Sequence, residues 1–282
     1  MNPPKKNQPI AFITGASGGF GLLTSIALAK AGYFVVASMR NLAKKEKLVE
    51  LAQVKEVETS IKCIQLDVTK QDEIEDVMSE VINLYGRIDV LINNAGYAAG
   101  GYTEEVSLKA WRQQFETNFF GLVAVTKEVL PHMRKRLKGT IINLSSISGR
   151  MALPGLGPYS ASKHAVEGFS ESLRLEMLPY GVHVVLIEPG SYQTDIWAKG
   201  MGDFTADPSS PYKDKNERLL KIVNHIAKTA GDPEEVIRMI ARVAQDDHPD
   251  LRYPVGKGVK NQIRFKNLLP WRWLERVILK KL

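Results

Sequence analysis

The sequence is poor in the features that mark secreted and membrane-spanning proteins. A single cysteine, Cys63, excludes an internal disulfide and fits a reducing compartment such as the cytoplasm. The apolar runs, such as VVLI at 184–187, have the length of a strand and are far too short to span a bilayer. No apolar core follows the charged start MNPPKKNQP, so a signal peptide is not expected.

Most of the chain also lacks an excess of charge of one sign. The net charge of +7 comes from residues 251–282, where nine Lys and Arg stand against one Glu, while the remainder carries 29 basic and 30 acidic residues. A near-neutral body argues against a nucleic-acid-binding surface and leaves the basic C-terminal segment as a separate question. No metal site is predicted.

Strand-like apolar segments alternate with helix-like segments over most of the chain. Because the strand-like segments are apolar throughout, they indicate a parallel sheet buried on both faces. We therefore expect a single α/β domain over residues 1–282, a doubly wound parallel sheet (Rossmann fold) in three αβα layers, with its ligand site beyond the carboxyl ends of the strands. The expected strands are 11–14, 33–40, 61–68, 88–96, 139–146 and 183–190.

Residues 191–230 interrupt this alternation. They contain several glycines and prolines around short helical pieces, and they follow a strand end where a ligand would bind. A connection of this length is typical of a lid or binding loop, so we expect a substrate-binding lid. A disordered insertion is the alternative.

A glycine-rich turn, TGASGGFG at 14–21, lies between the first expected strand and the first expected helix. Gly15 permits a tight turn, while Gly19 and Gly21 leave room for a pyrophosphate and for packing of the helix on the strand. The amino end of the helix offers unpaired N–H groups and the positive end of its dipole. In this position the turn predicts dinucleotide binding.

The segment PYSASKHAVEG at 158–168 contains a candidate proton donor. On a helix, Tyr159 and Lys163 share a face, one turn apart. A phenol with the usual pKa of about 10 is a poor acid at neutral pH, and a neighbouring ammonium would lower that pKa. By itself this spacing is common by chance and fits an ordinary helix surface equally well.

Four motifs in the same order give the pair its context. They are TGASGGFG, NNAG at 93–96, the 13-residue spacing from Ser146 to Tyr159, and Tyr159-x-x-x-Lys163. Over residues 8–195 the chain resembles the short-chain dehydrogenase/reductase family, and EGFSESLRLE and IEPG resemble its branch of 17β-hydroxysteroid and retinol dehydrogenases. The resemblance implies an enzyme that interconverts a carbonyl, ketone or aldehyde, and an alcohol with a nicotinamide cofactor.

The resemblance also implies roles for four catalytic residues. Tyr159 is the general acid in reduction and the base in oxidation, and Ser146 donates a hydrogen bond to the substrate oxygen. Lys163 lowers the pKa of Tyr159 and binds the nicotinamide ribose, and Asn118 holds a water for proton relay to Lys163. Ser145 is expected to point to the other side of its strand.

The expected cofactor is NADP(H), with NAD(H) as the alternative. NAD enzymes usually carry Asp or Glu at the end of the second strand, where this chain has Met39 and Arg40. A guanidinium can pair with a 2′-phosphate that a carboxylate would repel, and Ser17 could add a hydrogen bond. However, Gly18 stands where some NADP enzymes of the family have a second basic residue. The cofactor-binding residues implied by the resemblance are Gly15, Ser17, Gly19, Phe20, Gly21, Arg40, Asp67, Val68, Asn94, Ala95, Gly96, Tyr159, Lys163, Pro189, Gly190 and Thr194.

The substrate is expected to be a small to medium apolar molecule. No Arg or His is placed to clamp a substrate carboxylate, and Arg150 is expected at the surface. A non-catalytic dinucleotide-sensing protein and an isomerase or epimerase with the same cofactor remain as alternatives. The expected substrate-binding residues are Ser146, Ile147, Tyr159 and Tyr192, with Met151, Leu153, Tyr97 and Ala98 completing the lining.

Residues 251–282 are expected to form a basic amphipathic extension. After Pro270 one helical face carries apolar residues and its flanks carry cations. The pattern predicts peripheral contact of residues 268–282 with an anionic membrane, or docking on the protein itself. Assembly as a homo-oligomer, a dimer or a tetramer, is implied by the family. The apolar face is Trp271, Leu274, Val277, Ile278 and Leu282, and the flanking cations are Arg272, Arg276, Lys280 and Lys281.

Overall fold

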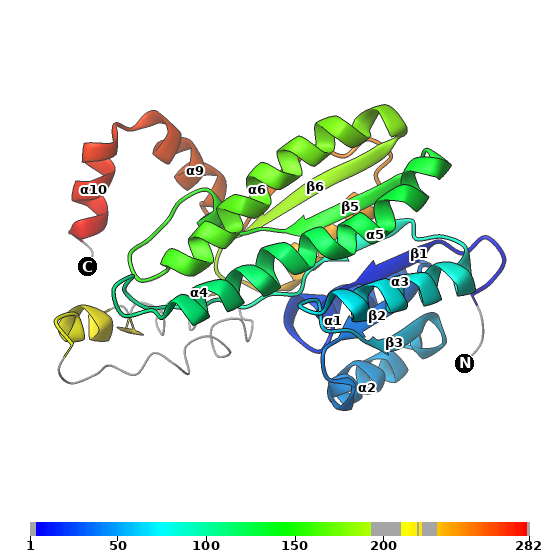
Figure 1. The fold of residues 1–282 in the computed structure, drawn as a ribbon. Coiled ribbons are helices and arrows are strands. Elements are labelled where there is room, and N and C mark those ends of the chain that lie inside the picture. The colour runs from blue at the N-terminus through cyan, green and yellow to red at the C-terminus, as the bar shows by residue number, and fades with distance from the viewer. Residues whose placement is uncertain (1–3, 193–209, 219, 222–229, 281–282) are drawn as a thin grey trace.

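The described residues of the computed structural model form one parallel sheet between two layers of helices (Figure 1). The structure describes residues 4–192, 210–218, 220–221 and 230–280. Seven strands lie in the order β3-β2-β1-β4-β5-β6-β7, and every neighbouring pair is parallel. The doubly wound α/β fold is therefore confirmed. The strands are β1 (Ile10–Ile13), β2 (Phe34–Met39), β3 (Ile61–Gln65), β4 (Val90–Asn93), β5 (Gly139–Leu144), β6 (Val182–Pro189) and β7 (Arg252–Val255).

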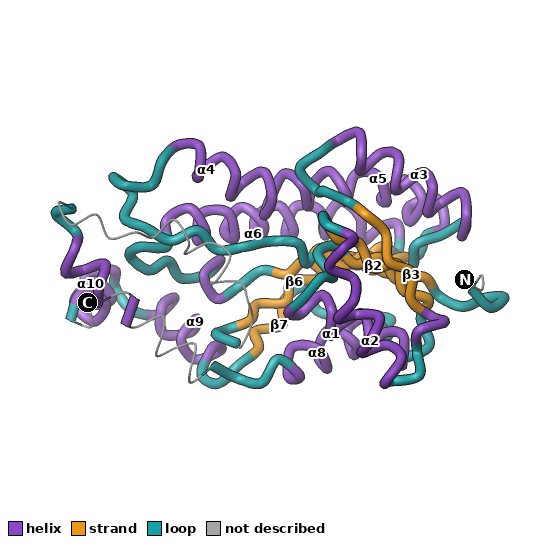
Figure 2. Tube along the Cα trace, turned by 90° about the horizontal axis from the view of Figure 1, so that it is seen from below, coloured by secondary structure: helices purple, strands orange, loops and turns teal. Residues whose placement is uncertain are grey.

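Both faces of the sheet are buried, which explains why its strands read as continuous apolar runs. In β1, Ala11 and Ile13 join one core cluster and Ile10 and Phe12 join the other, because successive side chains point to opposite faces. Figure 2 shows the two helical layers on either side of the strands. One layer holds α1 (Gly19–Lys30), α2 (Glu46–Val54) and α8 (Glu234–Ala244); the other holds α3 (Gln71–Tyr85), α5 (Gly121–Arg136) and α6 (Gly157–Met177).

The remaining helical segments are short or continue these helices. A π-helical stretch, Glu116–Phe120, joins α4 (Leu108–Phe115) to α5, so the helical backbone is nearly continuous from Leu108 to Arg136. Short 3₁₀ segments occur at Leu42–Lys45, Glu58–Ser60, Ile147–Gly149 and Leu178–Tyr180. α3 ends at Gly86, whose φ of +71° is in the left-handed region that glycine adopts most easily.

The C-terminal extension was predicted to begin at residue 251, and this boundary is wrong. Arg252–Val255 is β7, which pairs in parallel with Leu186–Pro189 of β6 and completes the sheet. The segment RYPV hides this role because it contains a charge and a proline, and an edge strand tolerates both. The extension proper consists of α9 (Val259–Leu268) and α10 (Trp271–Leu279).

Most of the expected lid, residues 191–230, lies outside the described residues. Within its described part, residues 210–218 pack on the loop after β4: the Tyr212 ring stacks on Tyr102 with centroids 4.5 Å apart, and the Tyr212 hydroxyl donates to Glu104. Across the ranges that the structure describes, no helix is both long enough and apolar enough to cross a bilayer.

Candidate active site

A cleft of about 900 Å³ opens at the carboxyl ends of β1 to β6. The strand order reverses between β1 and β4, and the loops that follow these strands diverge there, as in other doubly wound sheets. The cleft collects most residues predicted from the sequence. They are Gly15, Ser17, Gly19, Phe20, Arg40, Asp67, Val68, Asn94, Ala95, Gly96, Ser146, Ile147, Tyr159, Lys163, Pro189, Gly190 and Tyr192.

The glycine turn after β1 is fastened to the turn after β4. The Asn94 side chain donates to the carbonyls of Thr14 and Gly15, at 2.9 and 3.1 Å, and the Thr14 hydroxyl accepts the N–H groups of Asn94 and Ala95. Gly15 has φ +73°, and a Cβ there would lie 2.8 Å from the Cα of Ala95. This contact explains why the two motifs occur together.

Gly21 does not line the cleft, although it was predicted to bind cofactor. A Cβ at Gly21 would lie 2.5 Å from both the Asn94 Nδ2 and the Gly15 carbonyl oxygen. Gly21 therefore allows α1 to approach the turn, and its effect on the cleft is indirect.

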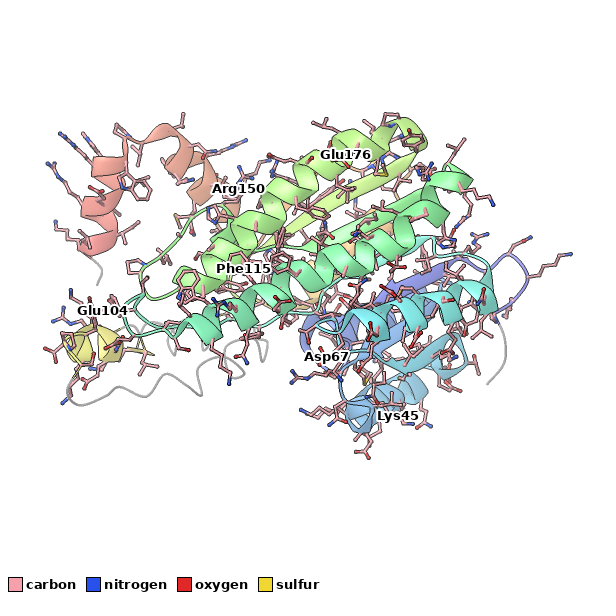
Figure 3. All side chains as sticks on the ribbon, in the orientation of Figure 1. Lys45, Asp67, Glu104, Phe115, Arg150 and Glu176 are labelled. Atoms are coloured by element: carbon pink, nitrogen blue, oxygen red, sulfur yellow. The ribbon has the colours of Figure 1, made fainter. Side chains whose placement is uncertain are left out.

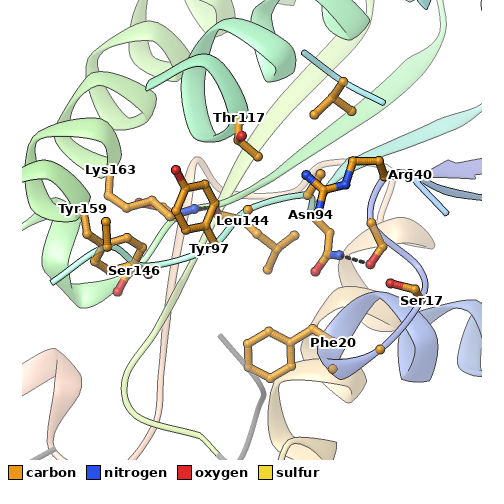
Figure 4. Close-up of a pocket in the computed structure, with 18 of the residues that line it drawn as sticks. Ser17, Phe20, Arg40, Asn94, Tyr97, Thr117, Leu144, Ser146, Tyr159 and Lys163 are labelled. Atoms are coloured by element: carbon orange, nitrogen blue, oxygen red, sulfur yellow. Dashed lines mark hydrogen bonds between the residues drawn. The ribbon is translucent and has the colours of Figure 1, made fainter. Parts of the chain in front are cut away.

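One end of the cleft is polar and carries cationic side chains (Figure 4). Arg40 and Ser17 lie there, as predicted. Asn41 and Lys44, from the segment that follows β2, also line the cleft. Lys44 was not predicted from the sequence, although the run of lysines soon after the second strand could have indicated it. Two cations on this wall favour a ligand group with negative charge.

The opposite end of the cleft brings together Ser146, Tyr159 and Lys163 (Figure 4). Ser146 follows β5, and the other two lie one turn apart on α6; all three are at most 7% exposed. The Lys163 Nζ donates to the Leu144 carbonyl at 2.6 Å and lies 5.9 Å from the centroid of the Tyr159 ring. The three polar groups thus lie together with little of their surface exposed to solvent.

Burial dominates the titration of this pair. Burial raises the pKa of Tyr159, and the hydrogen bond with the Ser146 side chain opposes that rise. Burial also lowers the pKa of Lys163 to about 8, with Glu167 opposing the change. The expectation that Lys163 lowers the pKa of Tyr159 is therefore wrong in direction, because burial disfavours the charged phenolate.

Asn118 lies beside the cleft, within the π-helical stretch. It is 1% exposed, and its side chain accepts the Tyr97 N–H at 3.1 Å and donates to the Tyr97 carbonyl at 3.0 Å. Its Nδ2 also donates to the Ser162 hydroxyl, at 3.2 Å. Such π-bulges recur at functional sites, and this one turns an amide toward the loop that forms a cleft wall.

The apolar lining of the cleft differs in part from the prediction. Tyr97, Ile147 and Tyr192 line it, and the Tyr192 hydroxyl donates to Glu235 at 2.8 Å. Ala99 replaces Ala98 in the lining, while Met151 and Leu153 do not contribute. Thr194 lies outside the described residues.

A family model of short chain dehydrogenases matches residues 9–202, which include the glycine turn and the Ser146, Tyr159 and Lys163 cluster. The chain belongs to this family. Membership confirms the resemblance drawn from the four motifs, and it makes the protein an oxidoreductase.

Two relatives of this short chain dehydrogenase cover nearly its whole length. An uncharacterized oxidoreductase, YusZ, of Bacillus subtilis is 47% identical over 279 residues, 98% of this chain and 99% of that protein. The 3-ketodihydrosphingosine reductase of Bacteroides thetaiotaomicron is 37% identical over 270 residues, 94% of this chain and 93% of that protein.

Solved structures show the same architecture. Actinorhodin polyketide ketoreductase with NADPH has a TM-score of 0.78 and 30% identity, over 91% of this chain and 99% of that one. A Burkholderia phymatum family member in complex with NAD has a TM-score of 0.79 over 95% of each chain, and its 21% identity shows the fold alone. Binding of a dinucleotide cofactor is thus supported for this family member, and the neighbours include both NADP and NAD complexes.

Behind the cleft this family member carries a buried ionic cluster that the sequence reasoning missed. The Ser145 hydroxyl donates to the Glu167 carboxylate on α6, and the expected opposite directions of Ser145 and Ser146 stay a prediction. The Arg252 Nε contacts Glu167 at 3.0 Å and Glu188 at 3.2 Å. Arg150 contacts Glu188 at 2.8 Å, so its prediction as a surface residue is wrong: Glu188 is fully buried and requires a partner.

The Glu167 carboxyl gives a first prediction. Burial, and then the charge of Glu188, raise the pKa of Glu167 to about 7 from a usual 4.5, against the hydrogen bonds from Ser145 and Arg252. Between pH 4.5 and 7 the folded state then binds more protons than the unfolded state, so stability decreases as the pH rises through this window. Denaturant unfolding across the window should show that slope, and Glu167→Gln should flatten it.

The exposed Glu176 on the same helix supplies the control for this prediction. Glu176→Gln should leave the slope as in the unaltered protein. An equal slope in the protein with and without the Glu167 carboxyl would contradict the raised pKa of Glu167.

Proposed function

We propose that the protein is an NADP(H)-dependent oxidoreductase that interconverts a carbonyl and an alcohol on a small to medium apolar substrate. The observation that carries the proposal is that one continuous cleft has Ser146, Tyr159 and Lys163 at one end and Arg40 with Ser17 at the other. A dinucleotide carries its reactive ring and its adenosine phosphate at opposite ends, which matches this division.

The cleft fits such a cofactor in shape and donor chemistry. Its volume of about 900 Å³ lies in the range of small-molecule sites. The amino end of α1 and its glycines suit a pyrophosphate, because backbone N–H groups can approach it without a Cβ in the way. The Asn94–Ala95–Gly96 turn and the Asp67–Val68 segment would flank the adenosine half.

When bound, the nicotinamide supplies or accepts a hydride. Tyr159 keeps its proton at neutral pH, since a phenol has a usual pKa of about 10 and burial raises the pKa of Tyr159 further, so its hydroxyl can donate to a carbonyl oxygen during reduction. The Ser146 hydroxyl is a second donor for that oxygen. After Tyr159 gives up its proton, the Lys163 ammonium, which Leu144 holds beside the ring, stabilises the phenolate. Asn118 keeps the Tyr97 wall in place and remains the proposed site of a relay water.

Preference for NADP(H) is supported by the cations at the adenosine end. Arg40 and Lys44 line this part of the cleft, and two positive charges suit a 2′-phosphate. The alternative is NAD(H). Because Met39 stands where NAD enzymes usually have an Asp or Glu, Asp67 or a backbone group would have to hold the ribose hydroxyls.

Replacing Arg40 tests this preference. Arg40→Gln should lower kcat/KM for NADPH by about 10- to 100-fold, because a charge-assisted hydrogen bond contributes roughly 1.5–3 kcal/mol. The value for NADH should change little. Initial rates with both cofactors give the ratio, and Arg238→Gln, at an exposed position on α8, is the matched control. An equal loss with both cofactors would sink the role of Arg40.

The substrate class rests on the apolar lining near Tyr159. Ile147, Tyr97 and Tyr192 present mostly hydrocarbon there. One relative is named for reducing 3-ketodihydrosphingosine, a long-chain ketone, which supports an apolar carbonyl compound. We also propose that the protein assembles as a dimer or tetramer and that it is cytoplasmic. Residues 268–282 would then contact a membrane surface.

The proposed function is tested by cofactor consumption with a panel of apolar ketones and aldehydes. NADPH should be oxidised faster than NADH with at least one of them. Faster oxidation of NADH would overturn the cofactor preference while leaving the reaction. Conversion of substrate without net consumption of either cofactor would point instead to an isomerase or epimerase.

A further inference from the structure

The last two helices leave large apolar side chains in water. α9 buries only Val259 and Ile263, and α10 buries only Leu274. The other large apolar residues of the pair, apart from the half-buried Ile278, are between 53% and 79% exposed. Large apolar side chains that two consecutive helices leave exposed indicate an interaction surface. These exposed side chains, here called the apolar tail face, are Phe265, Leu268, Trp271, Trp273, Val277 and Leu279.

Cations surround the apolar tail face. From the start of α9 to Lys280, the last described residue, the chain carries six Lys and Arg and a single acidic residue, Glu275. Figure 3 shows nitrogen-tipped side chains projecting from the outer side of α10, away from the sheet. Exposed tryptophans beside a cationic flank are the pattern of a helix that lies in a membrane interface. The cations are Lys260, Arg264, Lys266, Arg272, Arg276 and Lys280.

We propose that α9 and α10 bind the surface of an anionic lipid bilayer, with the apolar tail face at the headgroup boundary and the flanking cations on the lipid phosphates. Charge complementarity selects this occupant over a second copy of the chain. A self-complementary interface would bring the same cations together with one Glu275 on each side to offset them. Each Lys or Arg near an anionic surface instead adds to binding, and burial of Trp and Leu side chains adds further.

The membrane surface would lie next to the substrate end of the cleft. β7 leads directly into α9, and the Gly190 N–H donates to the Val255 carbonyl at 2.9 Å. A Cβ at Gly190 would lie 2.7 Å from the Val259 side chain at the start of α9. Because Gly190 and Tyr192 line the cleft, α9 begins at the cleft wall.

This arrangement deepens the proposed function by naming a substrate class. The substrate would be a long-chain ketone or alcohol that partitions into the bilayer, so that the enzyme meets it at the interface. This part of the inference rests on the proposed oxidoreductase activity toward apolar carbonyls. Binding of the bilayer itself does not depend on that activity.

Vesicle co-sedimentation of the full-length protein tests the surface. Vesicles of phosphatidylcholine with phosphatidylserine should pellet the protein, vesicles of phosphatidylcholine alone should pellet much less, and added salt should weaken the binding. The double variant Arg272→Glu, Arg276→Glu should bind at least about tenfold more weakly. The matched control, Arg238→Glu with Arg242→Glu on exposed positions of α8, changes the net charge equally and should bind as the unaltered protein does.

The apolar contribution has its own variant. Trp271→Ser with Trp273→Ser should lose vesicle binding by a similar factor while the rate with a water-soluble ketone stays the same. With a long-chain ketone carried in anionic vesicles, the same variant should lose kcat/KM in proportion to binding.

Two outcomes would overturn the proposal that α9 and α10 bind an anionic bilayer. One is an absence of binding to anionic vesicles by the unaltered protein. The other is a decrease in oligomer size in the α10 variants, by analytical ultracentrifugation, without any change in vesicle binding, which would identify a second copy as the occupant. Vesicle binding without turnover of any ketone would support the membrane-binding surface and refute the proposed function instead.

Discussion

Replacing Tyr159 with phenylalanine is expected to lower kcat for ketone reduction by about 10²- to 10⁴-fold, the usual contribution of a positioned general acid. The substitution removes one oxygen from a ring that is 4% exposed, so the packing of α6 should persist. KM for NADPH should change far less than kcat, since the lost group acts on the substrate oxygen. Steady-state rates with NADPH and the best ketone of the panel measure the effect.

Tyr192→Phe is the matched control for this prediction. Tyr192 lines the same cleft, but its hydroxyl donates to Glu235 and so is already committed. The control should retain most of kcat. A loss of only a few-fold for Tyr159→Phe, or an equal loss for both variants, would show that Tyr159 does not deliver the proton.

Replacing Arg252 with methionine is expected to destabilise the protein by about 3–5 kcal/mol, the usual effect of removing one partner from a buried ionic cluster. Arg252 is shared by Glu167, Glu188 and Glu171. Glu188 is fully buried, and its Oε2 already has no hydrogen-bond partner within the described part of the chain. Removing Arg252 leaves the buried Glu188 paired with Arg150 alone and takes away the ion-pair partner of Glu167.

Urea unfolding at a pH above 7 measures this loss, with Arg238→Met as the exposed control. The loss should shrink at acid pH, because the pKa of Glu167 is already raised to about 7 and a protonated carboxyl no longer needs a counter-charge. A loss below about 1 kcal/mol, typical of a surface ion pair, would contradict the described cluster.

The parts that were predictable from sequence depend on local signals. The six expected strands are runs of apolar residues between helices, and the helices end near glycines such as Gly86. The cleft follows from strand order, because the carboxyl ends of parallel strands meet at one edge. Ser146, Tyr159 and Lys163 come together for the same reason, since one follows β5 and the others lie on the next helix.

The parts that were missed depend on distant contacts and on burial. β7 is recognisable only from its pairing with β6, because RYPV has neither alternation nor an apolar run. Arg150, Glu188 and Arg252 come from separate segments, and no spacing in the sequence indicates that they meet. The pKa of Tyr159 was predicted from the charge of Lys163 alone, whereas the depth of the pocket, which only the fold supplies, decides its direction.

The stoichiometry of the reaction tests the proposed oxidoreductase activity most directly. NADPH consumed and alcohol formed would be measured together, by absorbance of the reduced nicotinamide and by chromatography, with the best apolar ketone and with Tyr159→Phe alongside. One NADPH should be oxidised for each alcohol formed, and almost none of either in the variant. Tight binding of NADPH without consumption across the whole panel, vesicle-borne ketones included, would refute this activity and identify a dinucleotide-sensing protein.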